Sequence, residues 1–159
     1  MKIRIGNFRR GMRVERRRLT ALLHRALRGK KGEVSVAVVS RQKIRAINRK
    51  FLGRDCETDV IAFDMADREE RERGAVVGEI VVSADRTRSE AKRRGHSAQA
   101  ELALYVVHGA LHLLGMDDAK PAGAAAMYEA AVEILKKGGL RLSSAAGFSV
   151  EDEESLASL

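Results

Sequence analysis

Apolar positions along the chain follow two spacings, one typical of strands and one typical of helices. Runs of β-branched and alternating apolar residues predict strands at residues 2–7, 33–40, 58–65 and 75–83, the last interrupted by Gly78. Residues 66–74, between the last two strands, are almost all charged and predict the tip of a hairpin.

Segments with apolar residues three and four positions apart predict helices, several of which end at a glycine. The expected helices run from Glu15 to about Gly29 and over residues 41–52, 84–94, 97–114 and 124–139. Ser97 is the expected N-cap of the longest helix, and Gly115 its expected end. The final helix follows Pro121, the only proline in the chain.

This order of elements predicts one α+β domain over residues 1–140, with a small mixed sheet of about four strands covered by helices. No internal repeat or linker divides it. Residues 141–159 are polar and acidic and predict a flexible C-terminal tail.

Composition fits a globular cytoplasmic protein. The chain has 159 residues, of which 45% are hydrophobic and 33% charged, and its single cysteine, Cys56, excludes an internal disulfide. The N-terminal region lacks the apolar core of a signal peptide. The longest uncharged apolar segment, residues 102–116, is shorter than the ~20 residues that span a bilayer. We therefore expect no membrane association.

The formal net charge of +8 favours a polyanionic partner, most commonly nucleic acid. Two basic clusters are candidates for contact with a phosphate backbone, although such clusters are often only solvated faces; they are Arg16–Arg18 and the set Arg86, Arg88, Lys92, Arg93 and Arg94. Only 4% of residues are aromatic and none is Trp, which argues against base stacking as the main means of binding RNA.

The segment HGALHLLGMDD, residues 108–118, carries the most specific chemistry. His108 and His112 are four positions apart, so on a helix their rings share one face. Gly115 can end the helix and reverse the chain, which brings Asp117 or Asp118 within reach of the same point. The simpler alternative is a helix with two half-buried, hydrogen-bonded histidines. The complete pattern favours a metal site at the end of the long central helix.

Gly109 stands where zinc peptidases of the H-E-x-x-H type carry the glutamate that acts as general base. A peptidase mechanism therefore lacks its usual proton acceptor. The small residue would instead allow another backbone or a substrate to approach the helix closely.

Three segments together resemble the YbeY family of bacterial metallo-endoribonucleases, which act in ribosomal RNA maturation. Residues 108–118 match the family motif H-G-x-L-H-L-x-G-x-D-H at every fixed position except the last, where this chain has Asp118. The segment INRKFLGRDCETDVIAFDM resembles a second family motif through Asn48, Phe51, Asp55, Thr58, Asp59, Val60 and Phe63. GEIVVS, residues 78–83, resembles a third, and the whole likeness covers about residues 34–137.

The resemblance implies one zinc ion per chain, held by His108, His112 and the residue at the third motif position. We expect Asp118 to be that ligand, because a carboxylate oxygen is an acceptable zinc donor. An aspartate is shorter than histidine and anionic, so affinity and the choice of metal are open. Asp117 would then cap the turn or hydrogen-bond to a ligand without contacting the metal itself.

Other residues are candidates for the cleft. The family often has an arginine where this chain has Leu52, and Arg54 or Arg49 is the nearest substitute that could contact a phosphate. Either could equally be a solvated surface residue. Thr58, Asp59 and Glu79 could shape the cleft or orient a ligand, or simply occupy turns and strand edges. Glu101, seven positions before His108, is a further candidate for supporting a ligand.

By this resemblance, the chain is expected to be a single-strand-specific, zinc-dependent endoribonuclease in 16S rRNA 3′-end maturation and ribosome quality control. The ribosomal subunit and its proteins are possible partners. The alternative is a non-catalytic RNA-binding assembly factor with a structural metal. Water and the RNA 2′-hydroxyl both stay open as the nucleophile, as do the cleavage position and the oligomeric state.

Overall fold

The computed structural model describes residues 1–143 of the chain. Its centre is a four-stranded sheet in the order β1-β2-β4-β3. The strands are β1 (Lys2–Asn7), β2 (Gly32–Val39), β3 (Val60–Asp64) and β4 (Val76–Ser83). β1 and β4 pair with β2 in parallel, and β3 pairs with β4 antiparallel, so the predicted mixed sheet is confirmed.

Six helices accompany the sheet in the described part of the chain. They are α1 (Arg16–Ala26), α2 (Arg41–Leu52), α3 (Arg68–Glu72), α4 (Ala84–Arg94), α5 (Ala98–Leu113) and α6 (Pro121–Lys137). The expected order of elements is confirmed apart from the addition of α3 between β3 and β4.

The charged hairpin tip forms the short helix α3 rather than an irregular loop. Asp67 accepts a hydrogen bond from the backbone N–H of Glu70 at 2.8 Å, and the Glu70 carboxylate accepts one from the Asp67 N–H at 2.9 Å. This reciprocal capping satisfies two N–H groups that a helix start would otherwise leave open. Similarly, α6 begins at Pro121 and not at residue 124, because a proline is well suited to the first helical position.

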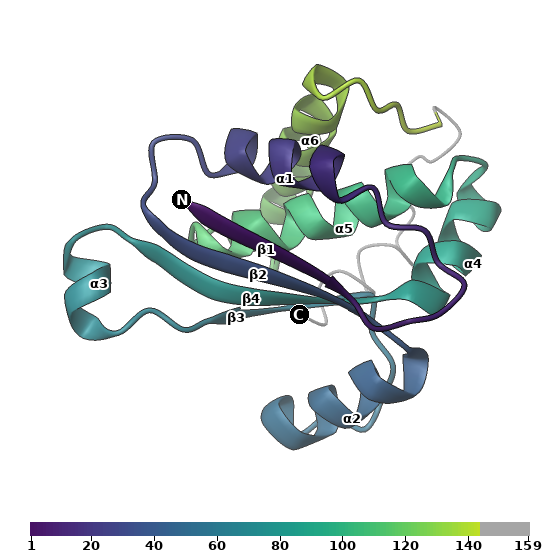
Figure 1. The fold of residues 1–159 in the computed structure, drawn as a ribbon, viewed down its shortest axis with the longest axis horizontal. Coiled ribbons are helices and arrows are strands. Elements are labelled where there is room, and N and C mark those ends of the chain that lie inside the picture. The colour runs from purple at the N-terminus through teal and green to yellow at the C-terminus, as the bar shows by residue number, and fades with distance from the viewer. Residues whose placement is uncertain (144–159) are drawn as a thin grey trace.

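The two faces of the sheet are covered unequally. Helices α1 and α5 pack on one face, with α6 against these two helices, and α2 is the only helix of residues 1–143 that lies against the other face (Figure 1). The larger core lies between β2, β4 and α5, which is buried over nearly its whole length. On the α2 face the buried cluster is small and consists of Val39, Ile44, Ile61 and Val81.

Helix α5 has the ends that its sequence predicts. The Ser97 hydroxyl accepts a hydrogen bond from the Ala100 N–H at 3.1 Å, and Gly115 has a left-handed φ of 88° just after the helix. The Gly115 N–H donates to the His112 carbonyl at 2.8 Å, and the Met116 N–H donates to the Leu111 carbonyl at 3.1 Å. These bonds fold the chain back beneath the last turn of α5.

No helix within residues 1–143 is long and apolar enough to cross a membrane. Leu140 is buried against the core, close to the predicted end of the domain. Most of the predicted acidic tail, residues 144–159, lies outside the described residues, so the boundary after residue 140 and the flexibility of the tail stay predictions.

Candidate metal centre

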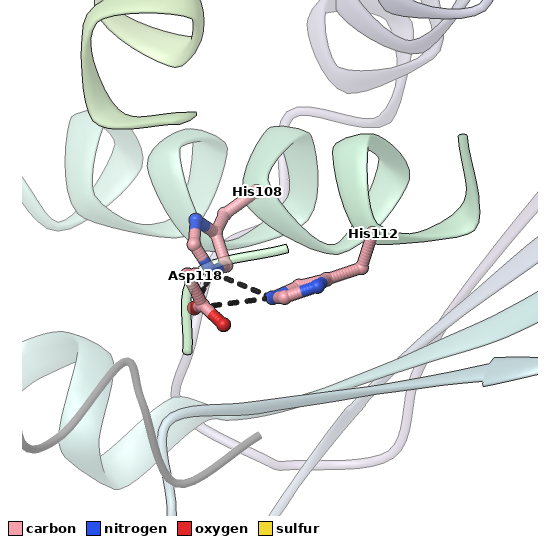
Figure 2. A group of neighbouring side chains, drawn as sticks. All are labelled: His108, His112 and Asp118. Carbon is pink, nitrogen blue, oxygen red and sulfur yellow. Dashed lines mark hydrogen bonds and ion pairs between the residues drawn. The ribbon is translucent and has the colours of Figure 1, made fainter. Parts of the chain in front are cut away.

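Three potential ligand atoms meet below the C-terminal half of α5 (Figure 2). The Nε2 atoms of His108 and His112 lie 3.0 Å apart. The Oδ2 atom of Asp118 lies 3.1 Å from the first of these nitrogens and 3.3 Å from the second. The three atoms therefore form a nearly equilateral triangle.

The size of this triangle fits a tetrahedral zinc ion. With zinc–ligand distances of about 2.0–2.1 Å, two ligand atoms of a tetrahedral site lie about 3.3–3.4 Å apart. The observed separations of 3.0–3.3 Å are only slightly shorter. Two imidazole nitrogens and one carboxylate oxygen also form a donor set that zinc accepts. The residues present thus fit one metal ion in both geometry and chemistry.

The local structure around Gly115 sets the third corner and fixes one ring at the same time. The chain reversal places the Met116 carbonyl 3.2 Å from Nδ1 of His112. A carbonyl can only accept, so Nδ1 carries the proton and Nε2 keeps its lone pair free for a metal. The same reversal leads to Asp118 two residues later, so one turn positions two of the three ligands.

Burial and mutual contact favour the ligand forms of these groups. The pKa of His112 lies below its ordinary value because the ring is partly buried and faces His108. Burial tends to raise the pKa of Asp118, but the hydrogen bond from His108 and the positive charge that either imidazole carries when protonated outweigh it, so the net pKa is lowered. A neutral imidazole beside an ionised carboxylate is the combination that binds a cation.

Gly123, in the first turn of α6, supports the loop that carries Asp118, and nothing in the motif spacing points to it. A Cβ atom at this position would lie 2.2 Å from the carbonyl oxygen of Asp117. The loop can therefore lie against α6 only if residue 123 has no side chain. A glycine in the first turn of an otherwise alanine-rich helix was the available signal, because glycine disfavours helix there.

The close approach expected at Gly109 is made by a side chain from the sheet. A Cβ atom at this position would lie 2.7 Å from Cγ2 of Ile80 on β4. Gly109 is buried and faces the core, so in the described structure it serves the packing of α5 on the sheet.

The remaining motif residues lie in different surroundings. Asp117 is exposed and accepts a hydrogen bond from the Ala119 N–H at 2.9 Å, which closes a turn. Asp59 is buried at the start of β3 and accepts a hydrogen bond from Nε of Arg86 at 2.7 Å. Thr58 is buried beside it, and its hydroxyl has no hydrogen-bond partner among residues 1–143.

Two further candidates lie away from the triangle of ligand atoms. Glu79 is on the α2 face of the sheet, where it shares a groove with Phe63 and Val81. Arg54 is exposed in the connection after Gly53, which ends α2 in a left-handed conformation. The functional roles expected for Arg54, Thr58, Asp59, Glu79 and Asp117 stay predictions.

Glu101 does not support a ligand histidine. It is fully buried, and its carboxylate binds the Arg94 guanidinium at 3.0 Å and the His96 ring. The predicted second basic cluster is also wrong in part, because Arg94 is buried in this network. Arg86, Arg88 and Arg93 form ion pairs with Asp59, Asp85 and Glu90, respectively. The exposed Arg16–Arg18 cluster at the start of α1 is present as expected.

Together, the mixed sheet, the buried helix α5 and the His–His–Asp triangle define an α+β protein with a group of side chains at the end of a helix that could hold one metal ion. The family model described as Endoribonuclease YbeY matches residues 5–139. The chain belongs to this family, as the sequence motifs predict.

Individual relatives agree with this assignment. Endoribonuclease YbeY of Bacillus velezensis is 42% identical over 115 residues, which cover 68% of this chain and 73% of the relative. The Bacillus subtilis protein of the same name is 40% identical over 118 residues, with 70% and 75% covered. The solution structure of TM1509 from Thermotoga maritima shares the fold, with a TM-score of 0.59 and 24% identity over 92% of this chain and 99% of that one.

Proposed function

We propose that this protein is a zinc-dependent endoribonuclease that cuts single-stranded RNA in the cytoplasm. Within that activity we propose 16S rRNA 3′-end maturation and ribosome quality control as its task, with ribosomal subunits as partners. The observation that carries the proposal is the triangle of Nε2, Nε2 and Oδ2 atoms, formed by the motif of a family whose curated members are named endoribonucleases.

His108, His112 and Asp118 would hold the zinc ion, and three protein ligands leave one tetrahedral position for water or substrate. When bound, zinc supplies a Lewis acid that polarises a phosphoryl oxygen and acidifies a coordinated hydroxyl. The side chain of His112 is 16% exposed, whereas those of His108 and Asp118 are each 3% exposed. Substrate would therefore approach from the side of His112.

The buried residues around the site would keep it rigid and exclude water from its inner side. His108 lies in the part of α5 that is completely buried, and its position is fixed by packing on both sides of the helix. Asp118 would partly neutralise the metal and leave a site with one unit less positive charge than a three-histidine site. Arg54 is our candidate for contact with a substrate phosphate.

The test is cleavage of a labelled single-stranded RNA by the zinc-loaded wild type, by chelator-treated protein and by His112→Ala. We expect cleavage only by the first, and recovery when zinc is returned to the chelated wild type. Glu133→Gln is the control, since Glu133 is an exposed carboxylate on α6 outside the triangle; it should retain most activity. A 2′,3′-cyclic phosphate end would identify the 2′-hydroxyl as nucleophile, and a 5′-phosphate would identify water.

Equal background cleavage by all samples, together with retained RNA binding, would contradict an enzyme. That outcome would favour a non-catalytic assembly factor with a structural metal. Cleavage of peptides but not of RNA would contradict both.

A further inference from the structure

A second concave surface lies on the α2 face of the sheet, and the metal centre does not use it. This groove has a volume of about 720 Å³ and is bordered by Phe8, Lys43, Phe51, Phe63, Met65 and Glu79. Its floor includes Ala37 and Val81, which pair across β2 and β4. Among the described residues, α2 is the only helix that covers this face, which leaves the groove open (Figure 1).

The groove collects every phenylalanine of residues 1–143. Phe8 follows β1, Phe51 ends α2, and Phe63 lies in β3, yet all three border the same hollow. Phe8 is 74% exposed and Phe51 61% exposed, although burial of either ring would be favourable. Phe51 and Phe63 form an edge-to-face pair with ring centroids 5.7 Å apart. Exposed rings gathered in a groove mark a binding surface.

Positive charge surrounds these rings. Lys43 borders the groove, and Nζ of Lys50 lies 5.3 Å from the centroid of the Phe51 ring. Lys43 and Lys50 are exposed and form no ion pair within the described part of the chain, so their charges are available to a polyanion.

The groove and the metal centre lie on opposite sides of the same two strands. A Cβ atom at Gly78 on β4 would lie 2.7 Å from Cδ2 of Leu113, the residue after His112, and 2.7 Å from the Phe63 carbonyl oxygen. The metal-bearing end of α5 thus rests on the inner face of β4 beside Phe63, whose ring borders the groove on the outer face. β3 is the edge strand of the sheet. A single strand of RNA that passes round this edge would contact both sites.

We propose that this groove binds the unpaired bases of the RNA segment next to the cleavage position. Bases stack on Phe51 and Phe8, while the backbone phosphates bind Lys43 and Lys50 at the border of the groove. This combination of aromatic rings with flanking cations is how proteins bind single strands without sequence preference. The carboxylate of Glu79 within the groove repels phosphate and accepts hydrogen bonds from base N–H groups, the N3–H of uracil included. The inference rests on the proposed function, because it supposes an RNA substrate.

It also revises the expectation from composition. The chain has few aromatic residues, but the phenylalanines of residues 1–143 are concentrated on one surface. A low total therefore does not exclude base stacking.

The test compares zinc-loaded protein bound to two labelled probes, a 2′-O-methyl oligouridylate of ten nucleotides and an abasic phosphodiester of the same length. Phe51→Ala should weaken binding of the oligouridylate by about fivefold to a hundredfold, as expected for the loss of one stacked base. Phe51→Tyr, which keeps the ring, should restore it. Leu52→Ala is the matched control, because Leu52 is an exposed apolar neighbour that does not border the groove.

Phe8→Ala, in a different element, should have the same effect as Phe51→Ala, which excludes a local disturbance of α2. All these variants should bind the abasic probe like the wild type. Equal binding of the oligouridylate by wild type and both alanine variants would overturn the proposal. Equal loss on both probes would also overturn it, because the groove would then not recognise bases. A change in self-association without a change in RNA affinity would identify the groove as a protein contact, and this result would also overturn the proposal.

Cleavage assays separate this inference from the proposed function. If the wild type cuts RNA and Phe51→Ala cuts it with unchanged KM, only the groove proposal fails. If the zinc-loaded wild type cuts no RNA, the proposed function fails, whatever the binding measurements give.

Discussion

The side chain of Ile80 on β4 occupies the space that a side chain on residue 109 of α5 would need. The Cγ2 atom of Ile80 would lie 2.7 Å from a Cβ atom at Gly109, well inside van der Waals contact. Because Gly109 has no side chain, α5 can pack this close to β4. Position 109 directly follows His108 and precedes His112, so the same packing sets the distance of both histidines from the sheet.

We therefore predict that Gly109→Ala lowers the free energy of unfolding by about 1–3 kcal/mol, the usual effect of overpacking a core. Chemical denaturation measures the change. In an Ile80→Ala background, the same substitution should be much less destabilising, because the obstructing methyl group is gone. Additive effects of the two substitutions would contradict the contact.

Removal of the third donor atom should weaken metal binding. Asp118→Ala is expected to lower zinc affinity by at least about 100-fold, more than the 10–100-fold typical of residues that only support a ligand. Asp118→His should retain one zinc per chain, because imidazole is an equally acceptable donor. Competition with a chelator provides the affinities, and Glu133→Ala, at an exposed position of α6, is the control. Full zinc occupancy and unchanged affinity in Asp118→Ala would show that Asp118 is not a ligand.

Gly123→Ala, in the first turn of α6, should weaken metal binding although residue 123 is not a ligand. A methyl group there would collide with the Asp117 carbonyl, so the loop must move away from α6 and take Asp118 with it. We expect about 10–100-fold weaker zinc binding, the range for residues that hold a ligand in place. Ala125→Gly, at an exposed position of the same helix, changes helix propensity without touching the loop. If both variants bind zinc like the wild type, the loop does not depend on Gly123.

The buried network around Glu101 should affect stability and not metal binding. Glu101→Gln removes the charge that compensates Arg94, and loss of one partner of a buried ion pair is destabilising by about 3–5 kcal/mol. Thermal and chemical unfolding measure this change, while zinc stoichiometry should stay at the wild-type value. A loss of zinc in a variant that is still folded would return Glu101 to the metal centre.

Local sequence patterns were sufficient for most of the fold. The strands and the ends of α5 follow from side-chain periodicity and from capping by Ser97 and Gly115, all of which depend on near neighbours. The helix α3 was missed because five charged residues have no apolar periodicity to reveal them. Its stability depends on the capping box of Asp67 and Glu70 rather than on packing.

The proximity of the three potential ligands could be predicted for the same reason, since helix geometry brings His108 and His112 together and a glycine turn returns Asp118 to them. Contacts between distant segments could not. Glu101 precedes His108 by seven positions, a spacing that puts both on the same face of α5. The Glu101 carboxylate nevertheless binds Arg94 and His96, which the turn between α4 and α5 brings close to it. Gly123 and the groove around Phe8, Phe51 and Phe63 likewise depend on which elements become neighbours.

The short sequence distance within the metal centre has a consequence for how it is loaded. His108 and Asp118 are only ten positions apart, so the loop that a bound metal ion closes is short. The entropic cost of closing it is therefore low. The hydrogen bonds of the turn already hold this loop in shape, and the three potential ligands found among residues 1–143 include none from a strand of the sheet. Binding and release of the ion should thus involve only the corner between α5 and α6, so the protein can exchange its metal without unfolding.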